Sequence, residues 1–394
     1  MKKLLLATAA TTLMAGASYA DEIKLGLMLG FSGPAESLAP DMAGGVRAAA
    51  KEISDSGKFL GGTTVAIVEG DSTCTDAAVA SSVAERMITS DGIVGLVGAL
   101  CSGATGAALT NVAVPNGMVM FSPSATSPSL TTIEDNGLFF RASPSDARQG
   151  QVMAESLLEK GVMTAAVTYT NNDYGKGLAD AFESSYTALG GKVTINTSHE
   201  DGKADYSAEV GALASAGGDI LVVVGYLDQG GPGIIRAALD TGAFDRFHLP
   251  DAMIGDTIEE RFGTEIEGAT GQVPGSDSPG GELLVAIGEA NGYNGTAPYA
   301  PESYDAGAMI LLAMQAAGSS DPQVYKDFVM GVANAPGEKI FPGELAKALD
   351  ILASGGEIDY VGGTAAELIE PGEAAGSYRE ILVKDGKITT VGYR

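Results

Sequence analysis

Residues 98–128, GALCSGATGAALTNVAVPNGMVMFSPSATSP, begin at the end of one short apolar run and contain a second, and the two runs predict neighbouring strands of one buried sheet. The runs cover residues 92–100 and 117–121, and each ends in a cluster of Ser, Thr, Gly and Pro. A short apolar run bounded by small residues is typical of a strand in a parallel sheet. Both hydroxyl clusters would then lie at the carboxyl edge of the sheet, where open α/β sheets bind ligands.

The two hydroxyl clusters have the chemistry of an anion site. Residues 101–105 lead into an alanine-rich helix, whose free N–H groups and positive dipole end favour an anion. Residues 122–127 add hydroxyl and N–H groups after the second strand. We interpret the pair as a cradle for a small carboxylate. The alternative is that both are ordinary strand-to-helix turns, in which Ser and Thr cap helices.

Strands and helices alternate in two series over most of the chain. The expected strands span 23–30, 64–68, 92–100 and 117–121 in the first series, and 163–168, 192–197, 220–224 and 247–250 in the second. Such alternation predicts an α/β fold with doubly wound parallel sheets. Breaks near residues 143, 275 and 356 predict one lobe from 21–142 plus 275–356 and another from 143–274 plus 357–394. A ligand would lie in the cleft between the two lobes.

The first 20 residues have the pattern of a secretory signal peptide. Lys2 and Lys3 precede an apolar run from 4 to 15, and Ser18-Tyr19-Ala20 is a small-residue cleavage site. The run is too short to span a bilayer as an anchor. We therefore expect cleavage after Ala20 and export of the mature chain.

The chain of 394 residues is strongly acidic, with a formal net charge of −27. Binding to nucleic acid or to an anionic membrane needs basic patches, so this charge argues against both partners. We interpret the charge as a solvated acidic surface. The alternative is an adaptation to a salty habitat or to high protein concentration, since net charge affects solubility more than fold.

The chain contains two cysteines, Cys74 and Cys101. In an exported protein, an even pair is most simply a disulfide, and two free buried thiols are the alternative. A bridge over this separation would stabilise the fold by about 3 kcal/mol in the chain-entropy model. No His accompanies the cysteines at the spacing of metal ligands, so we expect no metal site.

The sequence lacks the usual marks of an enzyme. It has no GxSxG elbow, no GxxxxGK[ST] phosphate loop, no GxGxxG fingerprint and no HExxH pair. We interpret His199 as a solvated loop residue. His248 is a candidate for a position near the cleft, but we do not expect it to contact the ligand. The acidic pairs Glu259/Glu260 and Glu302/Asp305 are better explained as helix-start acids than as a general acid and base. We therefore expect no catalytic residues and no cofactor.

Three side chains at the expected carboxyl ends of second-series strands are candidates for ligand contact. They are Tyr174, Tyr226 and Asp251. An aromatic ring there can cover an apolar group or a cation, and a carboxylate can pair with an ammonium. The structural alternatives are a packed turn residue for Tyr174 and a helix cap for Asp251.

Several of these segments, in this order, resemble one known family. They are residues 23–34, Cys74, 100–102, 122–128, 174–178 and 225–226. The chain resembles the periplasmic leucine/isoleucine/valine-binding proteins of ABC transporters, which have the type I periplasmic binding fold. The resemblance implies two lobes joined by a three-strand hinge, a location in the periplasm, and a monomer that delivers its ligand to a membrane ABC permease.

The resemblance also implies how an amino acid would be held. Its carboxylate would meet the hydroxyl and N–H groups of Ser102 and Thr126. Its ammonium would meet the carbonyl of Ser124, the hydroxyl of Thr126 and the carboxylate of Asp251, and Ala125 lies within the same turn. The family typically has Glu at the Asp251 position, so the shorter acid requires further closure or a bridging water.

The remaining implied contacts concern the second lobe and the side-chain pocket. Tyr174 and Tyr226 would close over the ligand, and Cys74 would pair with Cys101. Well-known members carry an aromatic residue where this chain has Leu38, so Leu38 would shape a different pocket. We therefore expect a branched-chain or other aliphatic amino acid. The alternative is an aromatic or other small carboxylate, or an amide or urea-type ligand, as in relatives with a longer C-terminal segment.

Overall fold

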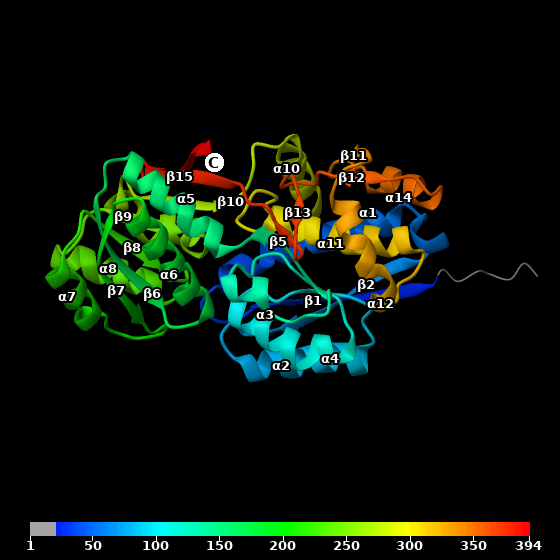
Figure 1. Cartoon of the computed structure of the whole chain (residues 1–394), viewed down its shortest axis with the longest axis horizontal. Helices are drawn as coiled ribbons and strands as arrows, with labels where there is room; N and C mark the ends of the chain where they lie inside the picture. The colour runs from blue at the N-terminus through cyan, green and yellow to red at the C-terminus, as the bar shows by residue number, and fades with distance from the viewer. Residues whose placement is uncertain (1–20) are drawn as a thin grey trace, which may run out of the picture.

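The computed structural model describes residues 21–394 and consists of two lobes, each built around a seven-stranded sheet (Figure 1). The predicted α/β class with two doubly wound lobes is confirmed. Strands β6 to β10 and their helices form one lobe, and β1 to β5 lie in the other. The predicted signal peptide lies outside the described residues.

The first sheet has its parallel strands at the centre and a short antiparallel pair at one edge. Its order is β13 (Leu368–Ile369), β14 (Glu373–Ala374), β5 (Phe139–Pro144), β4 (Met120–Ser122), β3 (Leu96–Gly98), β1 (Glu22–Leu29) and β2 (Thr64–Asp71). A separate two-stranded sheet pairs β11 (Glu338–Ile340) with β12 (Ile358–Tyr360).

The second sheet is parallel except for a C-terminal hairpin. Its order is β16 (Lys387–Tyr393), β15 (Tyr378–Lys384), β10 (Thr270–Pro274), β9 (Phe247–Pro250), β8 (Ile220–Val224), β6 (Thr164–Thr170) and β7 (Lys192–His199). The Asp385-Gly386 turn closes the hairpin of β15 and β16, and Asp-Gly is a dipeptide that favours such tight turns.

Helices cover both faces of each sheet. In the first lobe they are α1 (Ala39–Asp55), α2 (Ala77–Arg86), α3 (Ser102–Ala108), α4 (Val114–Asn116), α10 (Pro279–Asn291), α11 (Ala300–Ala317), α12 (Pro322–Tyr325), α13 (Val329–Ala333) and α14 (Leu345–Ala353). In the second lobe they are α5 (Asp146–Glu159), α6 (Asp173–Ala188), α7 (Ser207–Ala216), α8 (Gly230–Thr241) and α9 (Asp256–Phe262). Among residues 21–394, none of these helices is long and apolar enough to cross a membrane.

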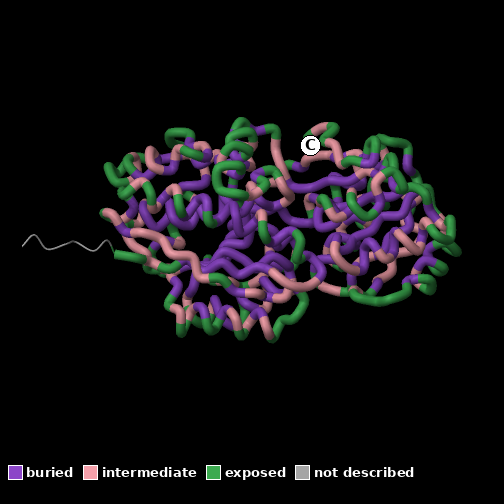
Figure 2. The backbone as a smooth tube through the Cα atoms, turned by 180° about the vertical axis from the view of Figure 1, so that it is seen from behind, coloured by how far each residue is buried: buried purple, intermediate pink, exposed green. Residues whose placement is uncertain are grey.

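The core lies along the two sheets, and the exposed backbone lies mainly at the outer helices and loops (Figure 2). Strand β8 reads ILVVV, and all five residues are buried. A central parallel strand is covered on both faces, so it is apolar throughout and does not alternate. The same rule explains why the short apolar runs of the sequence could be identified as strands.

The chain crosses between the lobes three times. The crossings follow β5, β10 and β14, because the element after each of these strands belongs to the other lobe. The boundary that we expected at residue 356 is wrong, since β14 pairs with β5 and residues 357–374 stay with the first lobe. A buried ion pair between Arg141 of β5 and Glu373 of β14 holds this segment in place.

The predicted disulfide is present between Cys74 and Cys101, whose Cα atoms are 5.1 Å apart. It joins the loop after β2 to the residue that precedes α3, and so restrains the carboxyl edge of the first sheet. Ser102 begins α3 and directly follows the bridged Cys101, so the disulfide also restrains the position of Ser102.

Removal of this disulfide is expected to destabilise the fold. The Cys74→Ser/Cys101→Ser variant should lose about 3 kcal/mol of unfolding free energy, because the unfolded chain regains the freedom of a loop closed over 27 residues. Urea denaturation measures the loss. A reductant should destabilise the wild type and leave the double variant unchanged; an equal response of both would contradict the assignment.

Candidate functional site

The hydroxyl clusters meet at the carboxyl edge of the first sheet. The backbone N–H of Ser127 donates to Ser102 Oγ (3.1 Å), which joins the turn after β4 to the start of α3. Ser124 Oγ donates to the Leu100 carbonyl (2.9 Å), and Ala125 is fully buried beside it. Thr126 is also buried. Hydrogen bonds therefore join the two clusters at this edge, and their role as a cradle for a carboxylate stays a prediction.

The second lobe brings its two tyrosines together at the opposite edge. Asn172 caps α6 by accepting from the Gly175 N–H (2.9 Å), which places Tyr174 in the first turn. A Cβ at position 175 would collide with the Thr170 carbonyl, so glycine allows α6 to start directly above β6. The rings of Tyr174 and Tyr226 stack with centroids 5.3 Å apart. Both residues are buried.

Asp251 lies at the centre of the site, directly after β9. Its Oδ1 accepts from Tyr174 Oη (2.7 Å) and from Gln149 Nε2 (3.2 Å), and its Oδ2 accepts from Tyr299 Oη. Tyr299 precedes α11 of the first lobe. The carboxylate therefore receives hydrogen bonds from both lobes, and it is buried.

A second carboxyl group, Asp146, lies next to Asp251. It begins α5, and its N–H donates to the Thr126 carbonyl (2.8 Å). Neither of its side-chain oxygens has a hydrogen-bond partner among residues 21–394. Burial raises the pKa of Asp146 well above its usual value, and the neighbouring charge of Asp251 raises it further. Burial also raises the pKa of Asp251, against hydrogen bonds from its tyrosines. Arg141 opposes this rise in the pKa of Asp146, but its effect is smaller than that of burial. Among residues 21–394, neither acid forms an ion pair with Lys or Arg, so the pair favours a cationic partner.

Three residues of this site were missed by the sequence reasoning: Asp146, Gln149 and Tyr299. Asp146 and Gln149 follow the first crossing, where the strand pattern breaks off, and no strand end marks them. Tyr299 lies between two helices and has a φ of 65°. The signal that was available is the position of Ser145, which caps α5 and so places Asp146 in the first turn.

Residues 22–330 match the sequence model of a family described as periplasmic binding proteins. The chain belongs to this family. It is 31% identical to the "Leu/Ile/Val-binding protein homolog 1" of Brucella melitensis, over 80% of this chain and 84% of the relative. It is 27% identical to the "Leucine-, isoleucine-, valine-, threonine-, and alanine-binding protein" of Pseudomonas aeruginosa, with the same coverage.

Solved structures of periplasmic binding proteins have the same fold. A leucine-binding protein of Thermotoga maritima gives a TM-score of 0.80 at 22% identity, and the match covers 94% of this chain and 98% of that protein. A solute-binding protein of an R. palustris ABC transporter, in complex with benzoate, gives 0.77 at 18% identity, with 94% and 96% covered. The fold that the sequence resemblance implied is therefore confirmed.

The lobes of this periplasmic binding protein are also in direct contact around the candidate site. The Ser37 N–H donates to Asp228 Oδ2 (2.9 Å), and the Asp228 N–H donates to the Pro34 carbonyl (3.1 Å). Ser127 Oγ donates to the Asp173 carbonyl (3.1 Å). These bonds join elements of opposite lobes, so the structure represents a closed arrangement of the two lobes.

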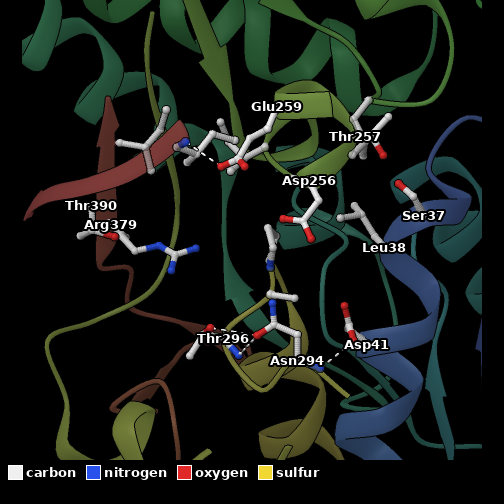
Figure 3. Close-up of a pocket in the computed structure, with 17 residues that line it drawn as sticks. Ser37, Leu38, Asp41, Asp256, Thr257, Glu259, Asn294, Thr296, Arg379 and Thr390 are labelled. Atoms are coloured by element: carbon white, nitrogen blue, oxygen red, sulfur yellow. Dashed lines mark hydrogen bonds between the residues drawn. The ribbon is translucent and has the colours of Figure 1, made fainter. Parts of the chain in front are cut away.

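Leu38 lies at the start of α1, where it lines a cavity between the lobes (Figure 3). It is one of several residues around this cavity that come from both lobes, including Leu227 and Ile254. Leu38 is thus close to the segment that follows Asp251 and does not itself lie among the hydroxyl clusters. Its expected role in shaping the ligand pocket stays a prediction.

The two histidines do not belong to the candidate site. His199 was expected to be solvated, and this is wrong: it is buried at the end of β7, where Nδ1 lies 2.9 Å from Thr168 Oγ1. Burial lowers its pKa to about 4. His248 is buried within β9 between Thr270 and Gln272 of the neighbouring strand. Among residues 21–394, no cluster of His, Cys, Asp or Glu is suited to a metal ion.

The acidic pairs also lie outside the site. Glu259 accepts from Lys387 Nζ (2.8 Å) and from the Ile388 N–H (2.7 Å), which attaches α9 to β16. Asp305 accepts from the N–H groups of Gly363 (2.8 Å) and Thr364 (2.9 Å). Glu302 is in the first turn of α11, as expected, but it is buried beneath the interlobe crossings and burial raises its pKa to about 8.

Glu302 is expected to make stability depend on pH. The pKa of Glu302 is about 8 in the folded chain and near 4.5 when the side chain is exposed. Its contribution to the free energy of unfolding is therefore complete below pH 4.5 and is lost as the pH rises towards 8. Between pH 5 and 8, the wild type should lose more unfolding free energy than Glu302→Gln, by more than about 1 kcal/mol. Urea denaturation at both pH values tests this. Parallel losses in the two proteins would contradict it.

Proposed function

We propose that this protein captures a small amino acid between its two lobes and delivers it to the membrane permease of an ABC importer. The observation that carries the proposal is the pair of buried acids, Asp146 and Asp251, beside the buried hydroxyl groups of Ser102 and Thr126. An α-amino acid has one cationic and one anionic group, and these match the two halves of the site.

The ligand would lie with each charged end against a different set of groups. Its carboxylate meets Ser102 and Thr126, near the start of α3, where the helix dipole favours an anion. Its ammonium meets Asp251 and the carbonyl of Ser124. Tyr174 and Tyr226 cover it from the second lobe. The hydrogen bonds that Asp251 receives keep the carboxylate in place before the ligand arrives.

The side chain of the ligand is proposed to be branched or otherwise aliphatic. The printed names of the Brucella and Pseudomonas relatives support this class. A plain aromatic carboxylate is the second candidate, because the R. palustris neighbour holds benzoate. That ligand has no ammonium, so it would leave Asp146 and Asp251 as two buried acids without a cation, which is costly.

The delivery step follows from the closed arrangement. Closure brings Pro34 and Ser37 of one lobe against Asp228 of the other, and a permease can recognise this combined surface. The family supports export to the periplasm, where such a protein acts as a monomer in contact with the permease. We propose a binding role without chemical change of the ligand.

Calorimetry with a panel of ligands tests the proposal. The panel contains leucine, isoleucine, valine, alanine and benzoate, with no added metal. We expect at least one aliphatic amino acid to bind more tightly than benzoate. Binding of benzoate alone would support the second candidate and contradict the amino acid assignment. Turnover of the bound ligand would contradict the transport role.

A further inference from the structure

The helical run that begins at Glu36 receives no side-chain cap from its own lobe. The short helix η1 (Glu36–Leu38) continues directly into α1 (Ala39–Asp55). The two cap positions are occupied by Ala35 and Leu38, whose side chains have no hydrogen-bonding group. The first N–H groups of a helix lack partners within the helix, and a side-chain oxygen usually accepts from the second or third of them. The start of this run therefore needs an acceptor from elsewhere in the chain.

The second lobe supplies that acceptor. The N–H of Ser37, the second residue of the run, donates to Asp228 Oδ2 (2.9 Å), and the Asp228 N–H donates to the Pro34 carbonyl (3.1 Å). Asp228 lies between β8 and α8. Ser37 faces the boundary of the lobes, where it lines the same cavity as Thr257 of the second lobe (Figure 3). Because these bonds join different lobes, they break when the lobes separate.

Asp228 is also close in sequence to a residue of the candidate site. Tyr226 stacks on Tyr174, and its Oη lies 3.4 Å from Asn172 Nδ2. Leu227, which separates Tyr226 from Asp228, is buried. One short segment thus contains both the ring that we propose to cover the ligand and the carboxylate that reaches the other lobe. With only one residue between them, the position of Tyr226 restricts that of Asp228.

The hydrogen bonds of Asp228 are separate from the proposed ligand contacts. Its partners are Ser37, Pro34 and, through its own carbonyl, Arg261. The interlobe bond from Ser127 Oγ to the Asp173 carbonyl is different, because Ser127 directly follows Thr126 in the turn of the candidate site. A substitution at Ser127 would disturb the ligand contacts themselves. A substitution at Asp228 weakens closure alone.

We propose that Asp228 is a positioning residue that caps the helical run 36–55 only when the lobes are closed, and so controls how long a ligand stays bound. We call the contact of Asp228 with Ser37 the interlobe cap. The inference rests on the proposed function, in which the ligand lies between the lobes, and adds a residue that controls affinity without touching the ligand.

The interlobe cap has a specific effect on binding. It adds the same free energy to the closed form whichever ligand is inside, so its loss lowers the affinity for every ligand by the same factor. The contact forms after the ligand has entered the open cleft. Its loss should therefore raise the dissociation rate and leave the association rate unchanged.

The test compares the wild type with Asp228→Ala and Asp228→Asn by calorimetry and stopped-flow kinetics, using leucine, valine and alanine. Asp228→Ala removes the acceptor and should weaken each ligand about fivefold, through faster dissociation. Asparagine keeps an acceptor oxygen and caps helices about as well as aspartate, so Asp228→Asn should stay within about twofold of the wild type. Asp240→Ala removes an exposed acid from α8 of the same lobe and should have no effect.

Hydrogen exchange of the peptide that contains Ser37 reports the interlobe cap directly. In the wild type, bound leucine should slow amide exchange in residues 34–38, because the Ser37 N–H is then held by Asp228. Asp228→Ala should lose this slowing, and Asp228→Asn should keep it. Melting temperatures confirm that each variant is folded.

The outcomes separate the interlobe cap from the proposed function. Asp228→Ala affinities within about twofold of the wild type, or a loss for one ligand only, would overturn the cap and leave the amino acid site standing. Equal losses in Asp228→Asn and Asp240→Ala would assign the effect to overall charge and also overturn it. If the wild type binds no ligand, the proposed function fails. Exchange at Ser37 in the free protein then decides the cap, which requires faster exchange in Asp228→Ala than in the wild type.

Discussion

Asp251→Asn is expected to weaken amino acid binding by about 2 kcal/mol or more, which is roughly thirtyfold in Kd. The substitution keeps the shape of the side chain and removes the charge that would pair with the ammonium. Asp251 is buried, so solvent cannot screen the lost attraction. Calorimetry with the preferred amino acid measures the effect, and benzoate should not lose affinity.

Asp240→Asn provides the matched control for this variant. Asp240 is an exposed acid on α8 of the same lobe, and its only ion pair among the described residues is with Arg236 (3.7 Å). The Asp240→Asn substitution removes the same negative charge as Asp251→Asn, but from the exposed surface of the lobe. Equal losses in the two variants would mean that the overall charge matters instead of the contact, and an unchanged affinity in Asp251→Asn would contradict the proposed orientation of the ligand.

Arg141→Met is expected to give the largest loss of stability. Arg141 is buried, its Nη1 donates to the carbonyls of Ala125 (3.1 Å) and Ser127 (3.0 Å), and its guanidinium pairs with Glu373. Its removal leaves a buried carboxylate without its cation, which costs about 3–5 kcal/mol. Because it also holds the turn that contains Thr126, ligand affinity should fall together with stability. Urea denaturation and calorimetry measure the two losses.

A double variant separates the ion pair from the packing. Arg141→Met/Glu373→Gln removes both charges, so it should recover part of the stability that the single variant loses. Glu373 also accepts from Thr131 Oγ1 (2.8 Å), a bond that glutamine can keep. A single variant within about 1 kcal/mol of the wild type would show that the pair is not important for the fold.

The parts of the site that follow strands could be predicted from the sequence. Ser102 and Thr126 were found because apolar runs end just before them, and parallel strands bring their carboxyl ends to one edge. Tyr174, Tyr226 and Asp251 follow second-series strands in the same way. The disulfide followed from the number of cysteines and the expected export. In each case, a local pattern and one rule of sheet geometry were sufficient.

The parts that depend on contacts between distant segments could not be predicted in this way. Tyr299 reaches Asp251 from a turn between two helices, and no periodicity marks such a turn. Residues 357–363 resemble a connector because of their glycines, yet the chain crosses only after β14, which the pairing of Arg141 with Glu373 holds in the first lobe. His199 was judged by its polar neighbours, although its own side chain turns inward to Thr168.

The position of the ligand would be seen in a crystal structure of the protein with the amino acid that it binds most tightly. We expect the ammonium within hydrogen-bond distance of Asp251 and the carboxylate on Ser102 and Thr126, with both lobes closed over the ligand. An amino acid bound in the reverse orientation, or bound away from the cleft between the two sheets, would contradict this expectation.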